Sequence, residues 1–252
     1  MNNYLLNPSC VVSNILEQAE VVIKKQGMCS FKLVTIADLA GCSTKTLYNY
    51  FHNKEDIVTA LFIRHINMLQ QKVRLISSSE ALSNKEKIIY TSMLDPMRCL
   101  TAEKGDLCLN FTAANPQIHQ FASPEFIGNM QAVFFAMKEN NEAMWRQAID
   151  DGDLQSNKED IVECMFMLMT LQRGAVVMGQ NKFLRQFGYD NDARPTFNAI
   201  CRQVNLLRWK EKCPALSYPN MLKTIFPLLD TNNTNQQHFD LLFESLKYPI
   251  EL

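Results

Sequence analysis

Glycine and proline are scarce in this sequence, with eight and nine among 252 residues. Few residues therefore interrupt regular structure, which favours long helices. Neither charge is in excess, because 25 Lys and Arg stand against 26 Asp and Glu, and the net charge of −1 gives no sign of a polyanionic partner. With 47% hydrophobic and 20% charged residues, the chain has the composition of a globular protein with a substantial core, which argues against overall disorder.

Long apolar runs and cysteine pairs are also missing. No uninterrupted stretch of about 18 apolar residues is present to span a bilayer, and the start of the chain, MNNYLLNPSCVV, has no basic residue before its short apolar stretches. The eight cysteines form no CxxC pair, and Cys164 and Cys201 lie in apolar helical runs, where a thiol acts as a small hydrophobe. We therefore expect a reduced, cytoplasmic protein with no membrane partner.

Catalytic and metal-binding motifs are absent as well. The four histidines are scattered, and the sequence contains no HExxH, no Cys/His metal spacing, no phosphate-binding loop, no GxGxxG and no GxSxG. The segment Asp150-Asp151-Gly152-Asp153 lacks the later ligands of an EF-hand loop and indicates a turn that ends a helix. We expect no enzyme, no catalytic or metal-ligating residue, and no cofactor.

Apolar residues recur at three- and four-residue intervals through most of the chain, and no strand alternation persists, so we predict an all-α fold. The expected helices are 12–26, 33–40, 44–50, 54–75, 84 to about 96, 124–151, 157–180, 194–213 and 238–247. The polar stretch 77–84 is the expected boundary between an N-terminal part and a larger helical bundle.

Several side chains provide the expected helix starts. Ser43, Asn53 and Asn84 are candidate N-caps, and Ser123 precedes a proline at the first helical position. Ser156 with Glu159 has the spacing of a capping box. Beyond the helix 194–213, we expect prolines to interrupt the chain: Pro214, Pro219 and Pro227.

The N-terminal part carries a helix-turn-helix pattern. Two short expected helices, 33–40 and 44–50, are joined by a turn that contains Gly41. At 100° per residue, the second helix places Thr44, Lys45, Tyr48 and Asn49 on one polar face. The opposite side, which can pack inward, carries Leu47, Tyr50 and Phe51. A cation, hydroxyls and an amide suit the major groove of DNA, which is about 12 Å wide and admits one helix. Residues 1–75 also hold eight basic and five acidic residues, whereas the remainder holds 17 and 21.

The residues of this region resemble the DNA-binding domain of the tetracycline-repressor (TetR) family of bacterial transcriptional regulators. The resemblance covers about 45 residues without a gap, and four segments carry it: Ile15-Leu16 with Ala19 and Gly27; Ile36-Ala37 with Ala40-Gly41-Cys42-Ser43; Thr46-Leu47-Tyr48-Asn49-Tyr50-Phe51; and Asn53-Lys54-Glu55 with Ile57. It implies a three-helix DNA-binding domain at 1–53, a connecting helix at 54–76, and a helical ligand-binding and dimerisation domain at 77–252.

The resemblance also implies roles for individual residues. Thr44, Lys45, Thr46 and Asn49 would face base edges or nearby phosphates. Tyr48 would hydrogen-bond a phosphate, and Lys54 would hold the DNA backbone at the start of the fourth helix.

In the family, the C-terminal bundle dimerises and commonly holds a ligand pocket. Here ten of 13 Met and 12 of 15 Phe follow residue 75, and adaptable Met-rich walls suit an apolar or amphipathic effector. The same stripes are also what a packed core shows, and Arg173 could anchor an acidic ligand, form an ion pair or snorkel. The candidate lining is Met93, Met97, Phe111, Met130, Phe134, Met137, Trp145, Phe166, Met169 and Arg173.

The helices 157–180 and 195–213 are the expected dimer interface, because Gly174, Ala175 and Gly179 permit close approach, although such glycines can also serve packing within one chain. Together these features predict a homodimeric regulator that binds a double-stranded, near-palindromic operator, acts as a repressor and is released by a ligand. The alternative is a helical small-molecule-binding or adaptor protein that does not bind DNA.

Overall fold

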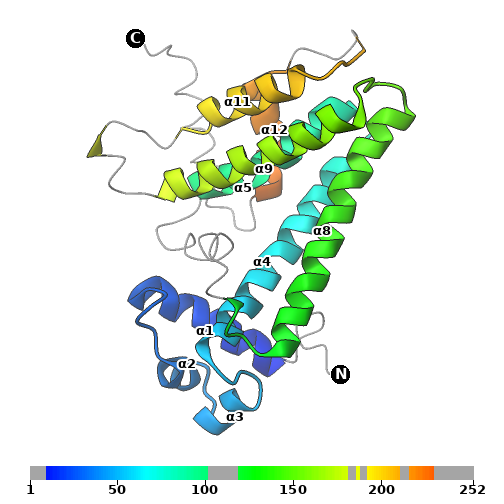
Figure 1. The fold of residues 1–252 in the computed structure, drawn as a ribbon. Coiled ribbons are helices and arrows are strands. Elements are labelled where there is room, and N and C mark those ends of the chain that lie inside the picture. Colours follow the sequence, from blue (N-terminus) through cyan, green and yellow to red (C-terminus); the bar gives the residue numbers. More distant parts are fainter. Residues whose placement is uncertain (1–9, 102–118, 181–185, 188–191, 211–215, 230–252) are drawn as a thin grey trace. The chain divides into compact units, whose positions relative to one another are not determined.

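The computed structural model describes residues 10–101, 119–180, 186–187, 192–210 and 216–229. Their regular structure is helical, apart from one isolated bridge between Leu154 and Trp209, which confirms the predicted all-α fold. The helices, labelled in Figure 1, are α1 (Cys10–Gln26), α2 (Leu33–Leu39), α3 (Thr44–Tyr48), α4 (Lys54–Ser77), α5 (Asn84–Thr101), α8 (Pro124–Asp150), α9 (Lys158–Gln180), α11 (Arg194–Asn205) and α12 (Tyr218–Leu229).

The described residues form two compact units. The first unit contains residues 10–71 and 119–140, and the second contains the described parts of 72–101 and 141–252. The first unit therefore includes the helix-turn-helix segment and also the first half of α8. The functional division at 1–53, 54–76 and 77–252 stays a prediction.

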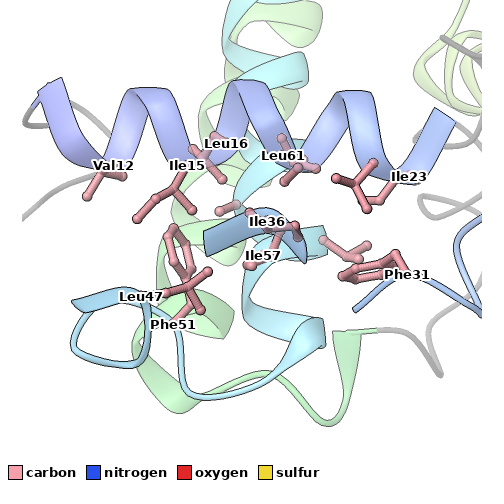
Figure 2. Close-up of a cluster of buried hydrophobic side chains, with 14 of the residues drawn as sticks. Val12, Ile15, Leu16, Ile23, Phe31, Ile36, Leu47, Phe51, Ile57 and Leu61 are labelled. Atoms are coloured by element: carbon pink, nitrogen blue, oxygen red, sulfur yellow. The ribbon is translucent and has the colours of Figure 1, made fainter. Parts of the chain in front are cut away.

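The first unit has a continuous apolar core, shown in Figure 2. The helical repeat of α1 places Ile15 and Ala19 fully inside, against Ile36 of α2, Leu47 of α3 and Ile57 of α4. Ala122 and Phe126, from the start of α8, belong to the same cluster. Full burial of a Leu or Ile side chain contributes about 1.5–3 kcal/mol, so the short helices α2 and α3 are held by this core.

Farther along, α4 and α8 lie side by side within the first unit. The rings of Phe62 and Phe134 are 5.8 Å apart, and Met130 and Met137 pack against the same small cluster around Phe62. The Gln70 side-chain amide donates to the Val133 carbonyl at 3.2 Å. A buried amide with a partner is tolerated in an apolar contact.

In the second unit, α5 contacts α9, α11 and α12, and α9 contacts α11. The helix α5 continues through Pro96 to Thr101, so of the kink or stop predicted near Pro96, the stop is wrong. Its N-cap is Ser83, which exchanges hydrogen bonds with Glu86 as a capping box, and not Asn84 as predicted. The Asn84 amide instead donates to Asp151 and Asp153 at 2.8 and 2.9 Å.

The predicted end of α11 and the predicted cap of α9 were also wrong, because these residues form hydrogen bonds with backbone groups that are distant in the sequence. The helix α11 ends at Asn205 and not near residue 213. Beyond it, the Lys210 amide donates to the Asp153 carbonyl, and the Gln155 amide donates to the Arg208 carbonyl, both at 2.9 Å. Ser156 accepts from the Arg208 amide, so Asn157 takes over as the cap of α9.

The prolines after α11 do not all interrupt helix. Pro219 lies in the first turn of α12, where a missing N–H leaves no bond unmade, and Pro227 lies near its end. The helix expected at 238–247, and Pro214, lie outside the described residues.

Candidate DNA-binding surface

Local hydrogen bonds define the start of the recognition helix α3. Gly41 takes a φ of +66°, a conformation that favours glycine, and turns the chain out of α2. The Ser43 hydroxyl then accepts from the Thr46 amide at 3.0 Å and so caps α3. The Ser43 and Thr46 hydroxyl oxygens also lie 2.8 Å apart. The predicted cap is therefore present, and the short helix begins at a fixed residue.

Two apolar side chains anchor the inner face of this segment. Leu47 is fully buried, Phe51 is 1% exposed, and Tyr50 packs partly against the same core. The Phe51 ring lies 5.6 Å from the Phe126 ring of α8. Because α3 is only five residues long, these anchors, and not helix propensity, set its orientation.

The opposite face carries the predicted DNA-binding residues. Lys45, Tyr48 and Asn49 are exposed, and Thr44 and Thr46 are half-buried. The burial pattern agrees with the helical wheel, although regular helix ends at Tyr48 and Asn49 is the C-cap. The surface presents a cation, a phenol, an amide and hydroxyls side by side. Their contacts with DNA stay a prediction.

Lys54, the first residue of α4, is half-buried beside the turn that follows α3. Its ammonium nitrogen lies 5.0 Å from the centre of the Phe31 ring, in a cation–π contact. This contact orients the side chain, while the ammonium keeps donors for an anion. Asn53 caps the same helix by accepting from the Asp56 amide at 2.7 Å.

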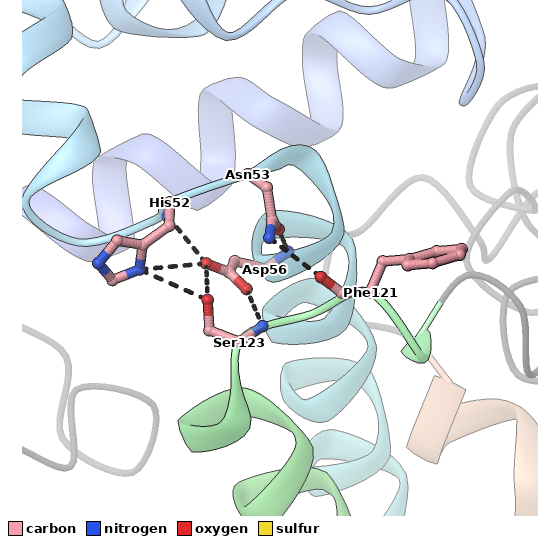
Figure 3. Close-up of polar contacts among 5 residues, drawn as sticks. All are labelled: His52, Asn53, Asp56, Phe121 and Ser123. Carbon is pink, nitrogen blue, oxygen red and sulfur yellow. Dashed lines mark hydrogen bonds and ion pairs between the residues drawn. The ribbon is translucent and has the colours of Figure 1, made fainter.

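Sequence reasoning missed a group of polar contacts directly behind this turn, shown in Figure 3. The fully buried Asp56 carboxylate accepts from the backbone amides of His52 and Ser123 and from the Ser123 hydroxyl. The Asn53 amide donates to the Phe121 carbonyl at 3.0 Å. The sequence signals were the cap at Asn53 and the Ser-Pro start of α8, but nothing indicated that the two ends meet.

The predicted ligand-pocket residues do not form one group. Met130, Phe134 and Met137 pack in the first unit, whereas Met93, Met97 and Trp145 are buried in the second. Arg173 is half-buried, and Phe111 lies outside the described residues. Phe166 and Met169, by contrast, are 62% and 51% exposed on α9. The assignment of these residues to a pocket stays a prediction.

The exposed face of α9 is unusually apolar. Val162, Phe166, Met169 and Val177 are each at least 38% exposed and recur at intervals of four, three and eight residues, which places them along one side of the helix. We call these four residues the α9 stripe. Residues 158–179 of this helix are also long and apolar enough to cross a bilayer by length and composition alone, a property shared by apolar helices that contact another protein.

Burial affects the thiols of two cysteines, the buried Cys164 and the half-buried Cys201. Burial raises the pKa of both the Cys164 and Cys201 thiols to about 11, so both stay protonated at neutral pH. Among the described residues, no three His, Cys, Asp or Glu side chains are grouped so as to hold a metal ion.

Comparison with known proteins agrees with the helix-turn-helix geometry. Residues 15–61 match the family model of bacterial regulatory proteins of the tetR family, which confirms the resemblance predicted from the sequence. A comparison with curated protein sequences finds no match.

Solved structures extend the likeness beyond this segment. FadR, a transcriptional regulator from Bacillus subtilis solved in complex with stearoyl-CoA, is 19% identical, with a TM-score of 0.52 over 77% of this chain and 96% of that chain. TetR-family regulators from Agrobacterium tumefaciens and Cytophaga hutchinsonii are 18% and 15% identical, with TM-scores of 0.56 and 0.58. They cover 80% and 79% of this chain, and 99% and 96% of their own. At these identities, the likeness shows the fold alone.

Proposed function

We propose that this chain, which carries the DNA-binding segment and the fold of the TetR-family transcriptional regulators, is a homodimeric repressor that binds a near-palindromic operator and is released by a ligand. The observation that carries the proposal is the recognition helix itself. The Ser43 cap and the buried Leu47 and Phe51 hold α3 so that its polar face points outward, within the segment that matches the family.

Each exposed residue on that face has a role suited to its chemistry. The Asn49 amide can donate and accept at once, as reading an adenine edge requires. Lys45 can reach a base or a phosphate. Tyr48 and Lys54 offer phosphate contacts, which fix position without reading sequence. Thr46 shares a hydrogen bond with Ser43, which uses one of the bonding sites of its hydroxyl and leaves others for DNA.

Assembly as a homodimer is supported by the α9 stripe. Apolar side chains repeated along one exposed side of a helix are expected to be covered by a partner. Gly174 lies on the same helix and is exposed, and a Cβ added there meets no atom of the chain within 4 Å. Packing among the described residues therefore does not require this glycine, which leaves its surface open to a close helix–helix contact with a second copy.

Ligand release is supported by the apolar interior of the second unit. Met93 and Met97 are fully buried on α5, and the buried Tyr218 hydroxyl lies 4.0 Å from the Met97 sulfur. Flexible thioether side chains beside one hydroxyl can repack around an apolar or amphipathic effector. FadR was solved with stearoyl-CoA, a molecule of this class. A tenfold loss of operator affinity needs about 1.4 kcal/mol of preference for the DNA-incompetent state.

The decisive experiment is footprinting of the purified protein on DNA upstream of its own coding sequence and on a randomised library. We expect protection of a near-palindrome whose half-sites are about 34–36 Å apart, or a multiple of that spacing. Failure to select any sequence from the library would refute the proposal. For the switch, fatty acids and acyl-CoA are titrated while the fluorescence of buried Trp145 and operator binding are followed together. Binding that changes fluorescence but never operator affinity would remove the switch from the proposal.

A further inference from the structure

The buried Asp56 joins two helices that are far apart in the sequence. Its Oδ1 atom accepts from the Ser123 amide at 2.6 Å, and its Oδ2 atom accepts from the His52 amide at 2.8 Å and from the Ser123 hydroxyl at 2.9 Å. His52 lies in the turn between α3 and α4, whereas Ser123 immediately precedes α8 (Figure 3). One carboxylate with no solvent exposure therefore connects the turn after the recognition helix to the first turn of α8.

Neighbouring contacts reinforce this connection. Asn53 accepts from the Asp56 amide and donates to the Phe121 carbonyl. Behind it, the Phe51 and Phe126 rings are in contact, and Phe126 lies in the core that also buries Leu47. The start of α8 is thus fixed to the recognition helix by polar and apolar contacts. We call the contacts of Asp56 and Asn53 with Phe121 and Ser123 the α4–α8 clamp.

The chain contains its own control for the clamp. The hexapeptide Asn-Lys-Glu-Asp-Ile-Val occurs at 53–58, where it starts α4, and again at 157–162, where it starts α9. The capping bond is the same in both copies, because the amides of Asp56 and Asp160 donate to Asn53 and Asn157 at 2.7 and 2.8 Å. Asp160, however, is exposed. The capping bond to the asparagine and any dipole effect of the aspartate are shared by the two copies, whereas Asp56 also accepts from His52 and Ser123.

We propose that Asp56 is a positioning residue for DNA binding. Through the clamp, the turn His52–Lys54 takes its operator-bound orientation only when the first turn of α8 is packed against it. This inference rests on the proposed function as a DNA-binding regulator. If Ser123 moves away, Oδ1 of Asp56 loses the Ser123 amide and Oδ2 loses the Ser123 hydroxyl, whereas Oδ2 keeps the His52 amide. Leaving a buried carboxylate with one of its three donors is costly, so an intermediate separation is disfavoured. The clamp is therefore closed or open, and an open clamp frees the turn that carries Lys54.

Because coupling is reciprocal, it can be measured from either side. DNA binding should increase the fraction of molecules whose clamp is closed, so amide hydrogen exchange at 121–127 should slow when the full-length protein binds its operator. An Asp56→Asn substitution replaces one carboxylate oxygen by an N–H₂ group. Because Oδ1 and Oδ2 each accept from a backbone N–H, the new N–H₂ faces another donor in either orientation, and the clamp opens with almost no change in side-chain volume. Asp160→Asn is the same change at the same helix position, where the side chain meets water.

We expect Asp56→Asn to weaken operator binding by about tenfold or more, the effect of losing a charge-assisted hydrogen bond, and Asp160→Asn to leave it within about twofold. Ser123→Ala should also weaken binding. The double variant should be no weaker than Asp56→Asn, because both changes remove the same contact. In Asp56→Asn, bound DNA should no longer slow exchange at 121–127. Near-UV circular dichroism shows that each variant is folded at the assay temperature.

Three outcomes overturn the inference. The first is DNA binding by the wild-type protein with no change of exchange at 121–127. The second is equal weakening by Asp56→Asn and Asp160→Asn. The third is a double variant whose loss of operator affinity equals the product of the losses in Asp56→Asn and Ser123→Ala. If the wild-type protein binds no DNA sequence specifically, both the proposed function and this inference are wrong. If it binds DNA specifically but exchange at 121–127 does not change, only this inference is wrong.

Discussion

Replacing Gly174 by Glu should affect the stability of the folded monomer and the stability of the proposed dimer in opposite directions. Gly174 lies within the long helix α9, and a Cβ added there meets nothing within 4 Å. Gly is about 0.8–1.0 kcal/mol less favourable than Ala in a helix interior, and Glu is close to Ala. The substitution should therefore stabilise the folded monomer by roughly 0.5–1 kcal/mol, since it relieves a weak helix position and causes no clash.

The same change should break the proposed dimer. In a two-fold interface each substitution enters twice, and burying an uncompensated carboxylate costs several kcal/mol. Even about 2 kcal/mol per protomer amounts to about 4 kcal/mol per dimer, which raises the dissociation constant roughly 1,000-fold. A dimer with a dissociation constant of about 1 nM would then be about half monomeric at about 1 μM and mostly monomeric at about 0.1 μM.

Sedimentation velocity on a concentration series measures this effect directly. Gly128→Glu is the matched control, because Gly128 is an exposed glycine of α8 where an added Cβ also meets nothing within 4 Å. We expect the control to remain dimeric. A Gly174→Glu protein that stays dimeric at the lowest concentration would show that this part of α9 is not the interface. A misfolded Gly174→Glu monomer would show that the glycine serves the chain itself.

Three further predictions concern single side chains. Asn49→Ala should cost about 1–3 kcal/mol of operator binding and relax the preference at one base position; unchanged binding to every operator variant would contradict a base contact. Lys54→Ala should weaken binding to all sequences alike and reduce the slope of log affinity against log salt by about one, and an unchanged slope would exclude a phosphate contact. Because the raised pKa of about 11 keeps Cys164 and Cys201 protonated, iodoacetamide at pH 8 should modify exposed Cys29 well before either. Peptide mapping by mass spectrometry gives the modification rate of each of the three cysteines. Equal rates would show that Cys164 and Cys201 become exposed to solvent readily.

Local features of the DNA-binding surface could be predicted from the sequence. The Ser43 cap depends on a residue three positions away, and the burial of Leu47 and Phe51 follows from helical periodicity and was matched in the structure. Such features need only short-range geometry. They fix which face of α3 is polar before any tertiary contact is known.

Features that depend on distant partners could not be predicted. The end of α11 is set by backbone bonds between 153–155 and 208–210, and Ser123 meets Asp56 across 67 positions. Hydrophobicity alone also gives no distinction between an inward and an outward apolar side chain. Met97 and Phe166 were both candidates for a pocket, yet the first is fully buried and the second is 62% exposed.

The clamp has a consequence for modularity. A fragment that ends at residue 76 would contain every residue of the helix-turn-helix, yet it would leave the Asp56 carboxylate without the two Ser123 donors and Phe51 without the Phe126 ring. The proposed DNA-binding part of this protein is therefore not a contiguous segment that can be excised or exchanged. A chimera that joins residues 10–76 to the C-terminal part of another regulator would also have to include residues 119–127. Otherwise the other regulator would have to supply an equivalent pair of donors and an aromatic ring.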